Sequence, residues 1–282
     1  MLNNLVEEFI DLALREDIGD GDHTSLACIP PDATGSAQLL AKEEGIIAGI
    51  GIAEKIFLKL DRTCEFNQLM KEGTKISSGK SVFLIKANIQ CILKAERLVL
   101  NIMQRMSGIA TQTSHYVRAL EGLNTKILDT RKTTPGMRLL DKEAVRIGGG
   151  VNHRIGLYDM ILLKDNHIDY AGGIEAAILR TKQYLAEKKK TLKIEIEARS
   201  IKDVETILKV GGVDRILLDN FSVADTHAAV KLINGAYETE SSGNITLDTI
   251  RSYAECGVDY ISSGALTHHI KSIDLSLKAI DF

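Results

Sequence analysis

The spacing of apolar and polar positions changes from one part of the chain to the next. Residues 3–16 carry apolar side chains at helical spacing with acidic residues between them, which predicts an amphipathic helix. From residue 35 to about residue 92, short apolar runs separated by turn-forming stretches predict strands, with one helix near residues 52–60. This first region is predicted to form a small mixed α/β domain.

Residues 91–120 show one long helical pattern, and after it the chain becomes regular. Six strand-like runs follow, with helical patterns between most of them: KILD near residue 126, MILLK near 160, KIEIE near 193, RILLD near 215, YETES near 237 and DYISSG near 259. Apolar strands that alternate with helices predict right-handed βαβ units, a parallel sheet, and a barrel or partial barrel.

Most of these predicted strands end in polar side chains. The residues concerned are Asp129 with Arg131 and Lys132, then Lys164, Glu197, Asp219, Ser242 and Ser263. A single hydrophilic strand end needs no function, but here charges end four successive strands. Because the carboxyl ends of all strands open onto one face of a βα barrel, where sites are built, this pattern predicts a binding site.

Positive charge concentrates around that predicted site, although the chain as a whole is slightly acidic. Residues 131–164 hold seven Lys or Arg and three Asp or Glu, whereas the formal net charge of the whole chain is -3. The overall charge gives no reason to expect binding to nucleic acid or to a membrane surface, so any anion binding must be local.

The cations of this region fall into two groups. The stronger candidates for binding an anion follow strands or glycines, and they are Arg131, Lys132, Arg154 and Lys164. The other cations share one face of a predicted helix and are expected to be exposed to solvent: Arg138, Lys142 and Arg146.

Three further stretches add candidate chemistry. The loop GGGVNHR, residues 148–154, is either a flexible loop or a close backbone approach to a ligand, and it places His153 beside Arg154. Glu197 and Asp219 have three interpretations: binding of Mg²⁺, acceptance of hydrogen bonds from sugar hydroxyls, or neutralisation of the lysines. ESSGN and SGALTHH place glycines and hydroxyls at the last two strand ends, a recurrent phosphate site. Together these features predict a phosphorylated sugar and an anionic acceptor as ligands.

The cysteines and the start of the chain indicate the compartment. Cys28, Cys64, Cys91 and Cys256 are far apart and lack metal-ligand spacing, so they are expected to be reduced, buried and inert. His167 is expected to bond the backbone at a strand end. The first residues lack a secretory pattern, and no stretch approaches the roughly 18 apolar residues of a membrane span, so we expect a cytoplasmic protein.

Several long motifs resemble a known family. In chain order they are ALREDIGDGDHTS, AERLVLNIMQRMSGIAT, ILDTRKTTPGMR, AVRIGGGVNHRIGLYDMILLKDNHI, IEIEA, ILLDNF, SSGNI and GVDYISSGALTHH. They resemble the motifs of the quinolinate phosphoribosyltransferase family, also called nicotinate-nucleotide pyrophosphorylase (carboxylating). The resemblance implies a type II phosphoribosyltransferase with an N-terminal α/β sandwich, residues 1–108, onto which residues 270–282 pack back. It also implies a C-terminal open α/β barrel, residues 109–269.

The same resemblance implies an activity and an assembly. The expected reaction converts quinolinate and phosphoribosyl pyrophosphate, with Mg²⁺, to nicotinate mononucleotide, pyrophosphate and CO₂ in NAD synthesis. The expected assembly is a homodimer, or a larger assembly built from dimers such as a hexamer, because Arg97 resembles an arginine that enters the neighbouring subunit's site. No nucleic-acid or membrane partner is expected.

The resemblance also assigns roles to residues of this chain. Quinolinate is expected to contact Arg131, His153, Arg154 and Lys164. The ribose and pyrophosphate are expected to lie at Lys132, Glu197 and Asp219, of which the two acids are the expected Mg²⁺ ligands. Lys132, Lys164, Glu197 and Asp219 form the expected catalytic set. The 5′-phosphate is expected among Ser242, Gly243, Asn244, Gly264 and His268, and the substrate-binding set also includes Ser263 and Ala265.

Two positions depart from the family pattern, and three alternative functions remain. Glu143 stands where an aromatic residue is common, and Asn244 stands where a glycine is frequent. The alternatives are a barrel lyase that uses Lys164 as a Schiff base, a noncatalytic phosphate-sensing barrel, and a phosphoribosyltransferase for nicotinate or another anion.

Overall fold

The structure is a computed structural model that describes residues 2–280, with side chains from residue 4 onward. It divides into two compact units. The second unit consists of residues 115–132 and 150–265, and the first consists of the described residues before, between and after those stretches. Along residues 2–280 no helix combines the length and the apolar character that crossing a membrane requires.

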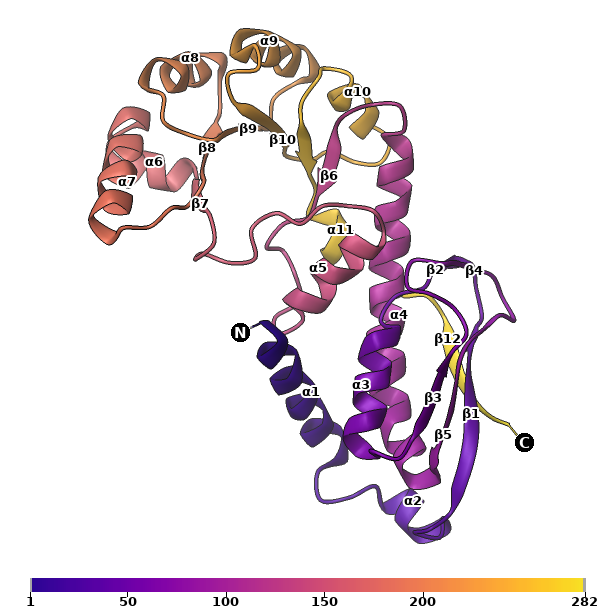
Figure 1. Cartoon of the computed structure of the whole chain (residues 1–282). Coiled ribbons are helices and arrows are strands. Elements are labelled where there is room, and N and C mark those ends of the chain that lie inside the picture. Colours follow the sequence, from indigo (N-terminus) through magenta and orange to yellow (C-terminus); the bar gives the residue numbers. More distant parts are fainter. Residues whose placement is uncertain (1, 281–282) are drawn as a thin grey trace. The chain divides into compact units, whose positions relative to one another are not determined.

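The first unit is built on an antiparallel sheet of four strands in the order β12-β1-β5-β3. These strands are β1 (Thr34–Ala41), β3 (Glu65–Gln68), β5 (Ser81–Asn88) and β12 (Leu275–Ile280), and a separate small sheet pairs β2 (Gly45–Ile46) with β4 (Lys75–Ile76). The helices are α1 (Leu2–Ile18), α2 (His23–Cys28), α3 (Ile50–Leu60), α5 (Arg138–Ile147) and most of α4 (Ile89–Ala119). Figure 1 shows α3 and α4 along one face of the four-stranded sheet, and the buried rings of Phe57 and Phe83 pack edge to face at 6.1 Å there.

The second unit is a parallel sheet of six strands in the order β6-β11-β10-β9-β8-β7. The strands are β6 (Lys126–Leu128), β7 (Ile161–Leu163), β8 (Ile194–Ala198), β9 (Arg215–Asp219), β10 (Glu238–Ser242) and β11 (Tyr260–Ser262). The helices are α6 (Asp165–Ala171), α7 (Ile174–Lys188), α8 (Ile201–Val210), α9 (Val223–Ile233) and α10 (Ile250–Ala254), and a short helix, α11 (Ala265–His268), starts at the last residue of the unit. The end strands β6 and β7 do not pair with each other within the described residues, so the barrel is open.

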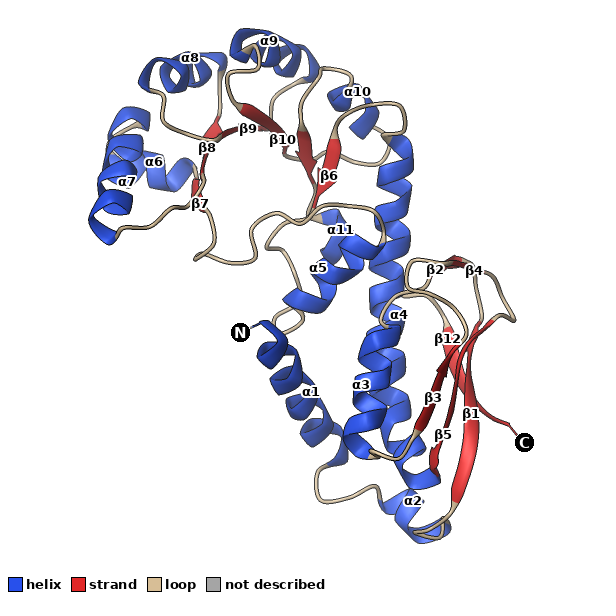
Figure 2. Ribbon diagram, viewed as in Figure 1, coloured by secondary structure: helices blue, strands red, loops and turns tan. Residues whose placement is uncertain are grey.

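Local chemistry explains why the second unit folds this way. All five residues of β8 are buried, as are the first four of β9, because the strands are covered on both faces. Figure 2 shows α7, α8, α9 and α10 outside the curved row of strands. Helices α8 and α9 each begin after a serine, Ser200 and Ser222, whose side-chain oxygen accepts a backbone N–H of the first turn. The fold class predicted from the sequence, including all six strands of the barrel, is confirmed.

The compact units do not end where the predicted domains end. Helix α4 runs through the predicted boundary at residues 108/109, and residues 133–149 belong to the first unit although the prediction placed them in the barrel domain. The physical reason is packing, because α5 lies against α1 and is tied to α4 by an ion pair between Arg105 and Asp141. Strand β12 pairs with β1, so the described end of the chain belongs to the first unit's sheet, while residues 281–282 of the predicted segment, like residue 1, lie outside the described residues.

The four cysteines are free, but the prediction that they are buried is wrong. Cys28 is exposed and the other three are half-buried. The Sγ of Cys28 contacts the carbonyl of Thr24 within the short helix α2. Burial raises the pKa of the Cys64, Cys91 and Cys256 thiols, which favours the unreactive protonated form.

Candidate functional site

Arg131 and Arg154 form the positive centre of the second unit. Arg154 is 9% exposed, and its Nη1 donates to the carbonyl of Met160 at 3.2 Å. Burial lowers the pKa of Arg154, and the charge of Arg131 lowers it further while nearby carboxylates oppose both effects. The Nε of Arg131 is buried and has no hydrogen-bond partner within the described residues. Two like charges held close together, one with an unused buried donor, favour the binding of an anion.

Lys164 and Glu197 lie at neighbouring strand ends, after β7 and at the end of β8. The Nζ of Lys164 is 3.2 Å from Oε1 of Glu197, and Oε2 of Glu197 accepts the backbone N–H of Asp165 at 3.0 Å. The lysine side chain is half exposed, whereas the carboxylate is nearly buried. His167 accepts the backbone N–H of Lys164 through Nδ1 at 3.1 Å, which confirms its predicted backbone role.

The ends of β9 and β10 are joined by one asparagine. Asn220 donates its backbone N–H to the carbonyl of Ser242 at 2.9 Å, and its Nδ2 donates to Oδ2 of Asp219 at 2.8 Å. The Nδ2 of Asn244 donates to Oδ1 of Asn220 at 3.4 Å. Gly243 has φ of +98°, and a Cβ at this position would collide with the Asn220 side chain. The loop therefore requires glycine at this position.

The last strand end carries Ser263, which follows β11. Its backbone N–H donates to the carbonyl of Leu128 at 3.1 Å, so the end of β11 is fixed against the end of β6. Ser263 is buried, while Gly264 and Ala265 are half-buried at the start of α11. Lys132 follows β6 and is exposed. The structure thus gathers the predicted strand-end residues of the second unit along one edge of its sheet.

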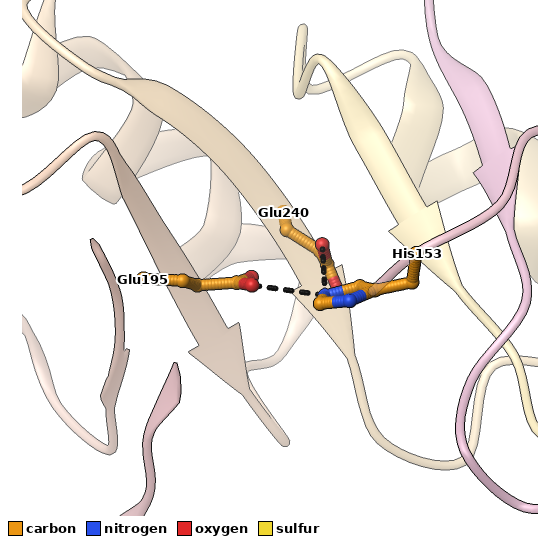
Figure 3. A group of neighbouring side chains, drawn as sticks. All are labelled: His153, Glu195 and Glu240. Atoms are coloured by element: carbon orange, nitrogen blue, oxygen red, sulfur yellow. Dashed lines mark ion pairs between the residues drawn. The ribbon is translucent and has the colours of Figure 1, made fainter. Parts of the chain in front are cut away.

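His153 lies inside the barrel between two buried acids, as Figure 3 shows. Its Nε2 is 2.9 Å from Oε2 of Glu195 and 3.5 Å from Oε2 of Glu240, and both glutamates are fully buried. Its Nδ1 accepts the backbone N–H of Arg154 at 2.7 Å. Glu240 is also held by Arg215, whose Nη1 donates to it at 2.9 Å. Two acids and two bases therefore neutralise one another in the interior of the barrel.

The pKa values within this cluster are strongly shifted. Burial lowers the pKa of His153, but its hydrogen bonds to Glu195 and Glu240 and their charges outweigh burial and raise it to about 9. Burial and the charge of Glu240 raise the pKa of Glu195 to about 7. The acceptor geometry of Nδ1 opposes the charging of His153, because a proton on Nδ1 would break the hydrogen bond to Arg154. Burial acts to raise the pKa of Glu240, but its hydrogen bond to His153 and the charges of His153 and Arg215 outweigh burial, so that pKa is lowered.

Two sets of side chains bear on cation binding: one buried group of three within the described residues, and the two strand-end acids predicted to bind Mg²⁺. His153, Glu195 and Glu240 lie within metal-ligand distance of one another. A histidine that binds a metal donates its other ring nitrogen's proton, whereas Nδ1 of His153 accepts one, so the cluster as it stands does not suit a metal. Glu197 and Asp219, at the ends of adjacent parallel strands, supply the carboxylate oxygens that Mg²⁺ prefers.

The first unit holds a second ionic network. Asp141 on α5 is fully buried and accepts both Nε and Nη2 of Arg105 at 2.8 Å, and the Nη2 also donates to the carbonyl of Thr267 at 3.0 Å. The backbone N–H of Thr134 donates to Asp141 at 3.2 Å. The pair thus connects α4 to the segment after Lys132 and to the helix that ends at His268.

One prediction for α5 is wrong. Lys142 was expected on a solvent-exposed face, but it is 1% exposed, whereas Arg146 is exposed and pairs with Glu143. Residues four apart share one side of a helix, but that side is not uniformly exposed where α5 packs against other elements. Arg97 lies exposed on α4, and His268 lies exposed at the end of α11, both in the first unit.

Sequence reasoning missed the interior residues Glu195, Glu240 and Arg215. A signal for the acids was present, because Glu195 and Glu197 alternate along β8, as Glu238 and Glu240 do along β10. Alternate residues of a strand point to the same face, so Glu195 shares a face with the strand-end Glu197, and Glu240 shares a face with the strand-end Ser242. The pairing of Arg215 with these acids depends on strand register and could not be predicted.

The open parallel barrel, with cations and carboxylates gathered at the carboxyl ends of its strands, has the architecture on which α/β-barrel enzymes build their sites. Comparison with known proteins identifies the family. "Quinolinate phosphoribosyl transferase, N-terminal domain" matches residues 22–107, and "Quinolinate phosphoribosyl transferase, C-terminal domain" matches residues 109–278. The chain belongs to the quinolinate phosphoribosyltransferase family.

Individual relatives agree with this assignment. The chain is 46% identical to a mitochondrial quinolinate phosphoribosyltransferase [decarboxylating] 2 of Nicotiana glauca, covering 97% of this chain and 82% of that protein. It is 39% identical to a probable nicotinate-nucleotide pyrophosphorylase [carboxylating] of Synechocystis, covering 98% of this chain and 93% of that protein. The solved structure of the nicotinate-nucleotide pyrophosphorylase from Francisella tularensis superimposes with a TM-score of 0.91 at 39% identity, covering 99% and 97% of the two chains.

Proposed function

We propose that this protein transfers a phosphoribosyl group to quinolinate and releases pyrophosphate and CO₂, forming nicotinate mononucleotide for NAD synthesis. Family membership over both domains supports the proposal, together with the names of relatives such as the Nicotiana enzyme. A lyase or a noncatalytic sensor is not favoured by these relationships. The proposal places the dicarboxylate of quinolinate at Arg131, Arg154 and Lys164. It places the phosphorylated ribose at the ends of the strands that follow β7.

The observation that carries the acceptor assignment is the pair of Arg131 and Arg154. Their like charges act on one another, and the buried Nε of Arg131 lacks a partner within the described residues. A ligand with two carboxylates on adjacent ring carbons would satisfy both guanidinium groups through paired hydrogen bonds. Lys164 adds a third positive charge at the end of β7, balanced in part by Glu197. A neutral acceptor would leave this set uncompensated.

The proposed mechanism relies on orientation and on charge stabilisation. The C1–O bond between ribose and pyrophosphate breaks, which leaves a cationic sugar carbon, and Lys132 stabilises the departing negative charge. The pyridine nitrogen forms the new bond to that carbon, and the clamped carboxylates fix the ring for this step. The alkylated ring is positive, so the adjacent carboxylate leaves as CO₂ and its electron pair stays on the ring carbon, which takes a proton. No protein nucleophile is needed.

Glu197 and Asp219 are the proposed holders of Mg²⁺, as carboxylates at adjacent strand ends. When bound, the ion supplies Lewis-acid stabilisation of the pyrophosphate oxygens. The chain's own contribution is to place Glu197 beside Lys164 and to fix Asp219 through Asn220. The residues proposed around the 5′-phosphate are Ser242, Gly243, Asn244, Ser263, Gly264, Ala265 and His268.

The proposed active assembly is a homodimer in which Arg97 of each subunit serves the other subunit's site. Arg97 is exposed on α4, as a residue that reaches a partner must be. The test mixes two inactive variants, Arg97→Ala and Lys132→Ala, after subunit exchange. A shared site regains activity in the mixture because one site of each mixed dimer is intact, whereas a site built by one subunit regains none. A cytoplasmic location is part of the proposal, although some plant relatives are named as mitochondrial or chloroplastic, and cell fractionation tests it.

A direct assay tests the main proposal. Purified protein is mixed with quinolinate, phosphoribosyl pyrophosphate and Mg²⁺, and mononucleotide formation is followed by absorbance, with each component omitted in turn as a control. Formation only in the complete mixture supports the proposal. Turnover of nicotinate in preference to quinolinate would assign a different acceptor, and binding of the donor without turnover would indicate a sensor.

A further inference from the structure

The proposed function leaves two buried acids of the barrel interior without a role. Glu195 and Glu240 are both fully buried, and Figure 3 shows them converging on the imidazole of His153. Apart from His153, neither side-chain oxygen of Glu195 has a hydrogen-bond partner within the described residues. A buried carboxylate with so few partners costs stability, and such costs are typically found where a site requires them.

The contacts of His153 fix it at three polar atoms. Its backbone N–H donates to Oδ1 of Asp129 at 2.8 Å, and its Nδ1 accepts the backbone N–H of Arg154 at 2.7 Å. Its Nε2 faces Oε2 of Glu195 at 2.9 Å. The ring therefore cannot turn without losing a contact at one end or the other. A shift of the ring would therefore move the backbone of Arg154, which is bonded to Nδ1.

The hydrogen bonds of this segment to the sheet end just before His153. Val151 pairs with the edge of β6 through its N–H to Ile127 at 2.9 Å and its carbonyl to Asp129 at 3.2 Å. Beyond Val151 the segment leaves the sheet. Arg154 is then positioned by His153, by the bond from its own guanidinium to Met160, and by Asp159, which accepts the backbone N–H groups of Ile155 and Gly156. The two acids contact His153 in a segment that has no neighbouring strand to hold it.

We propose that Glu195 and Glu240 are positioning residues for the acceptor, which act through His153 to hold Arg154 beside Arg131. His153 transmits this support to the backbone of Arg154 through its Nδ1. Glu195 is the direct support, and Oε2 of Glu240, which also faces His153, is held by Arg215. The inference rests on the proposed function, because it takes Arg154 to bind the acceptor's carboxylate.

The test measures kcat and KM for quinolinate and for phosphoribosyl pyrophosphate separately. Glu195→Leu removes the support of the ring, and it is expected to raise the KM for quinolinate about tenfold or more while the donor's KM stays within about twofold. Glu195→Gln retains an acceptor for the Nε2 proton and recovers most of that loss. The matched control is Glu238→Gln, because Glu238 pairs with Arg215 as Glu240 does but has no contact with His153. It is expected to leave both KM values unchanged.

A double-mutant cycle shows whether Glu195 acts through His153. In a His153→Ala background, Glu195→Leu should add less than about a twofold further change, because the ring it supports is already absent. Additive effects would overturn the proposal, as would equal changes in both KM values or an effect of Glu238→Gln as large as that of Glu195→Leu.

Stability and the underlying function are controlled separately. If Glu195→Leu does not fold, Glu195→Asp serves instead, since it keeps the acid and withdraws it from the ring by one methylene. It should raise the KM for quinolinate by at least about threefold, and an unchanged KM overturns the proposal. The wild-type protein is assayed first. If it forms no mononucleotide, the proposed function has failed, whereas wild-type turnover with silent Glu195 variants means that the positioning role alone has failed.

Discussion

Asp141→Asn removes one negative charge from the interior of the first unit without changing the shape of the side chain. Asp141 is fully buried and accepts two hydrogen bonds from Arg105 and one from the backbone N–H of Thr134. The asparagine has one acceptor oxygen in place of two, and its amide group turns a donor toward another donor. The arginine then lacks a charged partner in a site where its side chain is only 20% exposed.

The magnitude follows from those contacts. Breaking a buried ion pair by removing one partner costs about 3–5 kcal/mol, and the partial exposure of Arg105 favours the lower end. Loss of the Thr134 hydrogen bond adds about 1 kcal/mol. We therefore expect a loss of about 4 kcal/mol in the free energy of unfolding, which corresponds to roughly 8–16 °C in melting temperature.

The assay is thermal unfolding followed by circular dichroism, with Glu143→Gln as the control. Glu143 lies on the same helix and also makes a two-bond pair with an arginine, Arg146, but that pair is exposed. Its loss should cost less than about 1 kcal/mol. The comparison isolates burial, because the chemistry of the two pairs is the same. If Asp141→Asn melts within error of Glu143→Gln, the reasoning from burial is refuted.

Three further predictions concern the site. Arg154→Ala should raise the KM for quinolinate roughly 10- to 100-fold with little change in the donor's KM, and steady-state kinetics with equal changes for both substrates would refute the acceptor assignment. Gly243→Ala should weaken donor binding at least about tenfold in titration calorimetry, because the new Cβ collides with the side chain of Asn220. The control is Gly235→Ala, also at positive φ but in open space, which should leave donor binding unchanged. Equal weakening by both variants would contradict this reasoning. Because folding raises the pKa of His153 from 6.5 to about 9, its stabilising contribution is complete below pH 6.5 and is lost as the pH rises to about 9. The pKa of Glu195 is raised from 4.5 to about 7, so its ionisation destabilises the folded state as the pH rises through that range. The melting temperature should therefore fall from about pH 5 to about pH 9, and it should fall less steeply in Glu195→Gln. Parallel plots of melting temperature against pH for the two proteins would count against the pairing of Glu195 with His153.

Some of the site was predictable from sequence and some was not. The strand-end residues could be found because a parallel sheet places the ends of all its strands at one edge, whatever the details of packing. Glu197, Asp219 and Ser242 lie at the ends of β8, β9 and β10 as predicted. The burial of Lys142 was missed because a helical pattern shows which residues share a face but not which element covers that face.

The sequence by itself determined the order of elements, the parallel sheet, the location of the chemistry and the family. These properties follow from short-range patterns of apolar spacing and from motifs in which neighbouring residues act together. Only the tertiary structure decided that His153 faces Glu195 and Glu240 inside the barrel, and that Asp141 bonds Arg105 rather than solvent. Those contacts join residues from separate elements. Their distances depend on strand register and on helix packing. Both are determined by the free energy of the whole fold, and a local sequence pattern does not encode them.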